Sequence, residues 1–169
     1  KPIVEKLSNS IKKISAGPGN KHLGPISVDL IKKKINNYIL EAKKESEVIQ
    51  GDVEKGCFIP PTLVINPPLH LKLLKEEIFG PVMTIHPFKD EEEVITLANM
   101  TGYGLSASIF GKNYNQIYSI SRRIKTGTIT INDVLTHYGI ADLPFGGIGL
   151  SGIGKVHGKE GLRAYSRQK

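Results

Sequence analysis

Apolar residues recur at helical spacing near the start of the chain. They are separated by three or four positions, and they are Val4, Leu7, Ile11 and Ile14. This spacing is typical of an amphipathic helix, so we predict a helix over 2–15. The run GPGN at 17–20 follows and indicates a break.

A second amphipathic helix is predicted directly after this break. Ser27 has a side chain that can cap the helix, and Asp29 would lie in its first turn. The positions that would form one apolar face are Ile31, Ile35, Tyr38, Ile39 and Ala42. Gly51 and Gly56 then bracket an expected loop.

The rest of the chain alternates between strand-like and helix-like patterns. Strands are predicted over 82–88, 106–110 and 127–132, and helices over 90–100, 113–124 and 158–165. Alternation of this kind is typical of a parallel α/β sheet. The acids at 90–93 would oppose the dipole at the start of their helix. Residues 58–65 are also strand-like, but Pro60 and Pro61 suit an edge strand or a crossing segment better than a central strand.

Composition narrows the class of protein. The chain has 169 residues, of which 39% are hydrophobic and 23% charged, which fits one globular domain. None of its apolar runs approaches the ~20 residues of a membrane helix, so we expect no membrane segment in this chain. Cys57 is the only cysteine, which excludes an internal disulfide framework and favours a reducing, cytoplasmic location.

The net charge of +7 is concentrated at one end of the chain. Residues 1–44 contain ten lysines and three acids, so they carry the whole excess. Lys32, Lys33 and Lys34 are consecutive and would spread around a helix rather than form one stripe. We therefore interpret them as a solvated face and expect no nucleic-acid partner. The first residue is Lys1 rather than Met, which we interpret as the start of an internal piece of a longer protein.

Two apparent motifs do not carry chemistry. GIGLSG at 147–152 matches the dinucleotide pattern G-x-G-x-x-G, but Pro144 stands where a buried strand would need an amide donor. Cys57 has no histidine close in sequence, so we expect a small buried hydrophobic residue there rather than a nucleophile. The five histidines show no spacing typical of a metal site.

A series of short motifs, in order, resembles the aldehyde dehydrogenase superfamily across essentially the whole chain. The motifs are LGPIS at 23–27, GCFIPPTL at 56–63, EEIFGPV at 76–82, YGLSA at 103–107, TGTITIN at 126–132, LPFGG at 143–147 and SGIG at 151–154. Asn132 to Val134, His137 and His157-Gly158 look closer to the dimeric fatty- and aromatic-aldehyde branch.

This resemblance implies a fold and a domain assignment. The fold would be α/β, with a mostly parallel open sheet flanked by helices. Residues 1–169 would be the C-terminal portion of the catalytic domain. The N-terminal cofactor-binding domain and the nucleophile segment would be absent from the chain.

The resemblance also implies a reaction. In the family a cysteine thiolate attacks the aldehyde carbon, hydride passes to NAD or NADP, and a Glu-activated water hydrolyses the thioester. The nucleophile, the general base and the oxyanion asparagine lie upstream of the motifs found here. Cys57 does not match the nucleophile's motif, so no catalytic residue is assigned.

Five residues are assigned to binding sites by the same resemblance. Glu77 would bind the nicotinamide-ribose hydroxyls, and Phe79 would lie beside the nicotinamide ring. Asn132, His137 and Phe145 would line the substrate pocket. The alternatives are a surface acid for Glu77 and core packing for Phe79 or Phe145.

We therefore expect a fragment of an oxidoreductase that converts aldehydes to carboxylic acids and that is inactive alone. Its partners would be an aldehyde, the missing N-terminal part and further copies of the parent in a homo-oligomer. The alternative from another class is a non-catalytic binding or scaffolding module derived from the same fold. A basic nucleic-acid binder is a weaker third hypothesis, and salt-dependent binding to duplex DNA would reveal it.

Overall fold

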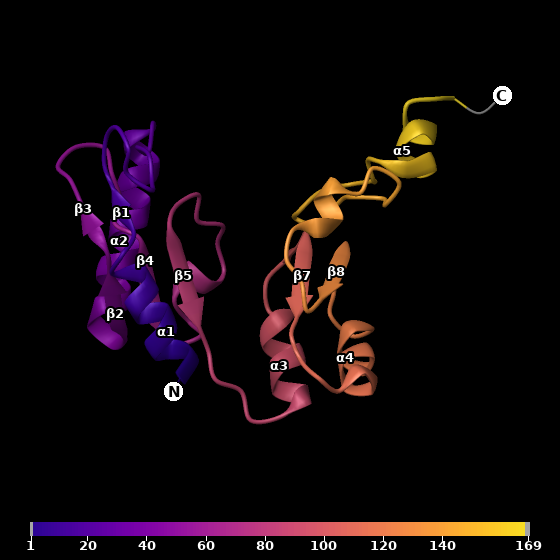
Figure 1. The fold of residues 1–169 in the computed structure, drawn as a ribbon, viewed down its shortest axis with the longest axis horizontal. Coiled ribbons are helices and arrows are strands. Elements are labelled where there is room, and N and C mark those ends of the chain that lie inside the picture. Colours follow the sequence, from indigo (N-terminus) through magenta and orange to yellow (C-terminus); the bar gives the residue numbers. More distant parts are fainter. Residues whose placement is uncertain (1, 168–169) are drawn as a thin grey trace. The chain divides into compact units, whose positions relative to one another are not determined.

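The computed structural model describes residues 2–167. The chain divides into two compact units, unit 1 up to Pro87 and unit 2 from Phe88, and each is described by itself (Figure 1). No helix within 2–167 has both the length and the apolar character needed to cross a membrane.

Within residues 2–87, unit 1 contains two helices, five short strands and one 3-10 turn. Its elements in chain order are α1 (Pro2–Ile11), β1 (Ser15–Ala16), α2 (Asp29–Glu45), β2 (Glu47–Gln50), β3 (Asp52–Val53), β4 (Thr62–Ile65), η1 (Lys72–Leu74) and β5 (Val82–Ile85). Strands β1 and β3 form a separate parallel pair.

The main sheet of unit 1 has the order β2-β4-β5, with β4 in the centre. Strand β4 pairs antiparallel with β2 and parallel with β5. Its residues Thr62, Leu63 and Val64 are fully buried. The prediction that this segment suits a sheet edge was wrong, because the strand begins only after Pro61 and so retains every amide donor of a central strand.

Helix α2 packs its predicted apolar face on this sheet. Ile35, Tyr38, Ile39 and Ala42 are buried, as the helical spacing indicated. Two clusters result, one around Tyr38, Ala42 and Val64 and the other around Ile35, Ile39 and Ile59. The apolar face of α2 therefore supplies much of the core of unit 1.

The start of α2 differs from the prediction. The N-cap residue is Val28, which has an extended backbone and makes no side-chain capping bond, so Ser27 is not the cap. The amide of Ile26 donates to the carbonyl of Cys57 at 2.7 Å, which ties the preceding residues to another segment. The helix consequently begins at Asp29, one residue later than a Ser27 cap would require.

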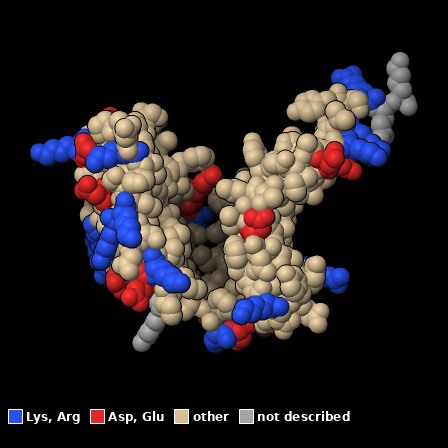
Figure 2. All heavy atoms as spheres, in the orientation of Figure 1, with Lys and Arg blue, Asp and Glu red and all other residues tan. Residues whose placement is uncertain are grey.

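Basic side chains are prominent on the face of unit 1 seen in Figure 2. Helix α2 contributes the consecutive lysines, of which Lys33 and Lys34 are exposed. Lys34 is also tied to a carboxylate, as described below. These positions agree with the interpretation of the charge as a solvated face.

Unit 2 contains the alternating part of the chain. Its elements are α3 (Glu91–Ala98), β6 (Tyr103–Gly104), β7 (Ser106–Ile109), α4 (Tyr114–Ser121), β8 (Thr128–Ile131), η2 (Thr136–Gly139), β9 (Ile148–Gly149) and α5 (Gly158–Ala164). Strands β7 and β8 pair in parallel and are joined through α4. This β-α-β unit confirms the predicted parallel connection.

Polar side chains cap the N-termini of α3 and α4, the two helices that accompany these strands. Asp90 accepts a hydrogen bond from the amide of Glu93 at 2.9 Å, and Glu93 in return accepts one from the amide of Lys89 at 2.8 Å. Asp90 is thus the N-cap of α3, and Glu93 binds back to the residue before the cap, which agrees with the structural interpretation of the acidic run at a helix start. Asn113 caps α4 by accepting from the amide of Gln116 at 3.2 Å.

The α/β class is confirmed, and three of the five strand pairings among the described residues are parallel. The strands of 2–167 form several small sheets rather than one continuous open sheet. The glycine-rich segment 147–152 contributes β9, which pairs antiparallel with β6. It does not form a strand-loop-helix phosphate site, in agreement with the rejection of the dinucleotide motif.

Candidate functional site

The segment 76–82 of unit 1 follows η1 and ends at the first residue of β5. The amide of Glu76 donates to the carbonyl of Lys72 at 2.9 Å, so the segment leaves a hydrogen-bonded turn. Two further backbone bonds follow within it, from Gly80 to Ile78 at 2.9 Å and from Val82 to Gly80 at 2.8 Å. Local backbone bonds thus constrain both ends of the segment.

Glu76 is tied to α2 by two side chains. The hydroxyl of Tyr38 donates to Oε2 of Glu76 at 2.5 Å, and Nζ of Lys34 lies 2.8 Å from the same oxygen. Nζ of Lys34 also lies 5.5 Å from the centroid of the Tyr38 ring. We call these three residues the Lys34–Tyr38–Glu76 cluster.

The cluster shifts the titration of its members. Hydrogen bonds from Lys34, and then from Tyr38, hold the pKa of Glu76 below its ordinary value. The Glu76 hydrogen bond raises the pKa of Lys34. Burial is the first cause of the raised pKa of Tyr38, and its bond to Glu76 is the second. At neutral pH the cluster therefore holds an ammonium group, a neutral phenol and a carboxylate.

Two further residues attach the segment to α2. Ile78 packs against both core clusters of unit 1. Gly80 lies so close to Ile35 that a Cβ atom there would meet Cδ1 of Ile35 at 2.5 Å. Alternate positions of the segment, Glu76, Ile78 and Gly80, are thus held against α2.

The intervening residues, Glu77 and Phe79, are exposed. Phe79 is 71% exposed, so core packing does not account for it within unit 1. Among residues 2–167 the carboxylate of Glu77 has no hydrogen-bond partner, and it is available as an acceptor. An exposed carboxylate two residues before an exposed aromatic ring is compatible with binding of a ribose and its attached nicotinamide. The assignment of both residues to the cofactor nevertheless stays a prediction.

Unit 2 brings two of the three predicted substrate-pocket residues together. The rings of His137 and Phe145 stack with centroids 5.8 Å apart and an interplanar angle of 29°. Tyr138 meets Phe145 edge-on at 5.3 Å, and His157 lies 6.1 Å from both Phe145 and Tyr138. We call these four rings the aromatic cluster of unit 2.

Backbone bonds hold the segments that carry the aromatic cluster. Phe145 and Val156 exchange two bonds, at 2.8 Å and 2.7 Å, and the amide of Gly158 donates to Ala141 at 2.9 Å. His157 has a φ of 65°, a conformation that is costly for a residue other than glycine. Nδ1 is buried and unpartnered in both His137 and His157 within the described residues. The cluster therefore combines four rings with two buried ring nitrogens that have no partner among the described residues.

Asn132 is placed differently from the other two predicted pocket residues. Its side-chain amide donates to the carbonyl of Gly111 at 3.0 Å and accepts from the amide of Gly111 at 2.8 Å. Its φ is 54°, which asparagine tolerates better than most residues. These two bonds hold the turn after β7 against the end of β8, and its pocket role stays a prediction.

Cys57 does not occupy the environment expected from its sequence. It is exposed, so the prediction of a small buried hydrophobic residue was wrong. The reason is local, since Cys57 follows Gly56, with a φ of 120°, in the loop between β3 and β4. Only its backbone carbonyl is engaged, by Ile26.

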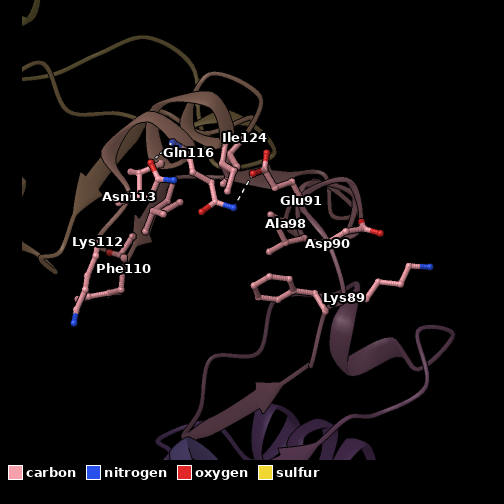
Figure 3. A pocket seen from close by; sticks show the side chains of 17 residues that line it. Lys89, Asp90, Glu91, Ala98, Phe110, Lys112, Asn113, Gln116 and Ile124 are labelled. Carbon is pink, nitrogen blue, oxygen red and sulfur yellow. Dashed lines mark hydrogen bonds between the residues drawn. The ribbon is translucent and has the colours of Figure 1, made fainter.

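The cavity shown in Figure 3 lies elsewhere in unit 2 and has a volume of about 530 Å³. It is lined by α3, α4, β7 and the turn after β7, and the side chain of Gln116 donates to Glu91 at 2.7 Å across it. None of the five predicted site residues lines this cavity. It therefore adds nothing to the assignment of the site.

Sequence reasoning missed the side chains that support the candidate site. Tyr38 was recognised only as an apolar-face residue, although its hydroxyl reaches a carboxylate 38 positions away. Tyr138 was not singled out, and His157 was noted only for its likeness to one branch. The adjacent acids at 76 and 77 were a signal in the sequence that one of them supports the site, because only one of two neighbouring carboxylates in such a segment can face α2.

A family model described as the aldehyde dehydrogenase family matches residues 1–169. Among curated proteins, an aldehyde dehydrogenase-like protein of Schizosaccharomyces pombe is 37% identical over 155 residues, covering 89% of this chain and 31% of that protein. An aldehyde dehydrogenase of Saccharomyces cerevisiae, named for NAD(P)+, is 36% identical over 154 residues, covering 87% of this chain and 30% of that protein.

Solved structures show the same likeness. A crystal structure of an aldehyde dehydrogenase from Burkholderia cenocepacia matches with a TM-score of 0.89 and 31% identity, covering 97% of this chain and 36% of that one. An aldehyde dehydrogenase of Mycobacterium tuberculosis complexed with NAD+ matches with a TM-score of 0.87 and 31% identity, covering 99% of this chain and 36% of that one. The chain thus spans about a third of the length of the proteins it matches.

Proposed function

The chain belongs to the aldehyde dehydrogenase family, and on that premise we propose that its residues serve an enzyme that oxidises aldehydes to carboxylic acids with NAD or NADP. The segment 76–82 would supply part of the cofactor site, and the aromatic cluster of unit 2 would supply part of the substrate pocket. The remaining catalytic groups would come from other parts of the parent enzyme.

One observation carries this proposal. In segment 76–82 the residues that face α2 are tied or packed, whereas Glu77 and Phe79 are exposed side chains on a constrained backbone. An aromatic ring held at a fixed, exposed position is unfavourable in contact with solvent. Together with the exposed acid, it suits a ligand that has both polar groups and a ring. The NAD(P)+ and NAD+ in the names of two relatives support this choice of ligand.

The chemistry of these two residues follows from their side chains. A nicotinamide cofactor, when bound, accepts the hydride that leaves the aldehyde carbon. Glu77 would accept hydrogen bonds from both hydroxyls of the nicotinamide ribose, because an ionised carboxylate is a strong double acceptor. Phe79 would restrict the ring to positions from which transfer can occur.

The substrate side of the proposal rests on unit 2. The rings of His137 and Phe145 are stacked, and the family resemblance assigns both residues to the substrate pocket. Stacked rings favour an apolar or aromatic substrate tail. We therefore propose that the parent acts on fatty or aromatic aldehydes, as a cytoplasmic homo-oligomer.

The covalent steps need groups that we do not assign within this chain. The family mechanism forms a thioester between a cysteine and the aldehyde carbon, and water activated by a glutamate then hydrolyses it. Cys57 lies in the loop between β3 and β4, in a motif that does not match the nucleophile's. We propose that residues 1–169 alone do not catalyse aldehyde oxidation.

The proposal is tested with the protein expressed from its complete gene. Short aliphatic, long aliphatic and aromatic aldehydes are each supplied with NAD or NADP, and formation of the reduced nicotinamide is followed by absorbance. We expect reduction that depends on aldehyde, fastest with the long or aromatic substrates. A folded protein that reduces neither cofactor with any aldehyde would favour the non-catalytic binding or scaffolding module instead.

A further inference from the structure

We propose that Lys34 and Tyr38 are positioning residues for the cofactor site, because they hold Glu76 and thereby fix the direction in which Glu77 and Phe79 project. This inference rests on the proposed function, since it concerns the same cofactor site. It assigns a role to two side chains of α2 that would not contact the cofactor themselves.

The first step of the argument is the attachment of the segment. Glu76 precedes Glu77 directly, so fixing the Glu76 side chain limits rotation of the peptide unit that carries Glu77. Ile78 and Gly80 fix the following positions against the core and against Ile35. Because three alternate positions are attached to α2 and the core, the two intervening side chains point away from that helix.

The second step is the rigidity of the anchor. Lys34 and Tyr38 are four residues apart on α2, so they lie on one face of a 17-residue helix. Tyr38 is only 6% exposed, and its ring belongs to the core cluster with Ala42 and Val64. A phenol whose ring is locked by packing holds its hydroxyl at a defined point, which a flexible surface side chain cannot do.

The third step is the nature of the bonds. Both bonds to Glu76 involve a charged group, and such bonds are shorter and stronger than neutral ones. Glu76 is ionised at neutral pH, as an ordinary glutamate would be, and its hydrogen bonds lower its pKa further, so the anchor is present under working conditions. The Tyr38 hydroxyl is committed to Glu76, which favours a positioning role over a direct catalytic one.

The test uses Tyr38→Phe in the protein expressed from its complete gene. This change retains the buried ring and removes only the hydroxyl. We expect the dissociation constant of NAD(P) to rise about fivefold, which is about 1 kcal/mol and less than the full contribution of a charge-assisted bond, because the lost bond acts on the cofactor only through the neighbouring residues. The Michaelis constant for aldehyde should stay close to that of the unmodified protein, and the melting temperature should fall only modestly, because one bond to Glu76 is lost while the buried ring is retained. Tyr118→Phe, which removes a hydroxyl from an exposed tyrosine of α4, is the matched control and should change neither constant.

A double variant tests whether Tyr38 acts through Glu77. If it does, Tyr38→Phe should have little further effect on cofactor affinity in a protein that already carries Glu77→Gln. Fully additive effects would overturn the positioning role. Lys34→Arg retains a charged donor and should preserve cofactor affinity, whereas Lys34→Gln should weaken it.

The remaining outcomes separate this inference from the proposed function. If Glu77→Gln weakens cofactor binding but Tyr38→Phe does not, the positioning inference fails and the proposed function stands. If neither variant affects cofactor binding, the cofactor assignment of the segment fails as well. If Tyr38→Phe lowers the melting temperature and reduces all kinetic constants in proportion, Tyr38 is a purely structural residue and the inference is overturned.

Discussion

Glu77 is the residue on which the cofactor assignment depends most. Its neighbour Glu76 is bonded through one carboxylate oxygen to Tyr38 and Lys34 of α2, whereas Glu77 is an exposed acid with no partner among the described residues. Under the proposed function these two adjacent carboxylates have different roles. Glu76 would stabilise the segment, and Glu77 would be available to bind the cofactor.

Replacing Glu77 by Gln in the complete protein tests this difference at a single residue. The change preserves size and removes the charge, so ribose hydroxyls lose a charged acceptor. We expect hydride transfer to slow by about tenfold or more, which corresponds to about 1.4 kcal/mol of transition-state stabilisation. Steady-state kinetics with varied cofactor and a melting curve measure the two effects, and the melting temperature should change little.

Glu41→Gln is the matched control, because Glu41 is an exposed acid on α2 without a side-chain partner among the described residues. If Glu77→Gln matches this control in both turnover and the cofactor's Michaelis constant, the ribose assignment is wrong. A large fall in melting temperature with a proportionate loss of activity would instead make Glu77 a structural residue.

The lowered pKa of Glu76 predicts a dependence of stability on pH. Its pKa lies below the ordinary value of 4.5 because of Lys34 first, Tyr38 second and the nearby charge of Lys72 last. A carboxyl group shifted in this direction stabilises the folded state above its ordinary pKa, and that contribution is lost as the pH falls through the lowered value. Denaturant titrations below pH 4.5 should therefore show a smaller loss of stability in Glu76→Gln than in the unmodified protein. Equal losses in both proteins would contradict the shift.

Several residue-level features could not be predicted from the sequence. Helical periodicity identified Tyr38 as a core residue, but a hydroxyl's partner across 38 positions depends on tertiary packing. The burial of Cys57 was predicted from its usual preference, and the loop geometry after Gly56 overrode that preference. The positive φ of His157 likewise cannot be recognised from the pattern of apolar and polar residues.

At the scale of elements, strongly periodic segments were predicted well and their ends less well. The first helix was predicted to reach residue 15 but ends at Ile11, and β5 ends at Ile85 rather than at residue 88. Strand β2 was not predicted, because its four residues follow α2 without a turn signal in between. Its pairing with β4 is a tertiary contact that local propensity does not encode.

The N-cap of α3 gives a prediction at this scale. Asp90→Ala removes the acceptor for the amide of Glu93 and should cost about 1 kcal/mol of helix stability. Amide hydrogen exchange in peptides that cover α3 should then accelerate about fivefold in the complete protein. Asp142→Ala, at an exposed acid without a capping bond, is the control. Unchanged exchange in α3 would mean that the cap contributes nothing to its stability.

At the scale of the whole molecule, the chain spans about a third of the length of its relatives. The proposed cofactor residues, Glu77 and Phe79, address only the nicotinamide-ribose end. In the family, the pyrophosphate and adenine contacts come from a separate domain, where a helix N-terminus faces the phosphates. Residues 1–169 are therefore expected to contact only the nicotinamide-ribose portion of the cofactor.

Weak binding of NAD by residues 1–169 follows from this division. Loss of the phosphate and adenine contacts should remove most of the binding free energy, because affinity depends on the sum of many contacts. Calorimetric titration of the chain with NAD should give a dissociation constant well above the micromolar range. A micromolar constant would show that these residues form a complete cofactor site by themselves.

The most direct test compares aldehyde-dependent reduction of NAD(P) by the protein expressed from its complete gene and by residues 1–169 alone. The complete protein should turn over, and the chain alone should show no turnover above background, because we assign neither the thiolate nor the general base to it. Turnover by the chain near the rate of the complete protein would contradict the account. Loss of that turnover in Cys57→Ser would then identify Cys57 as the nucleophile.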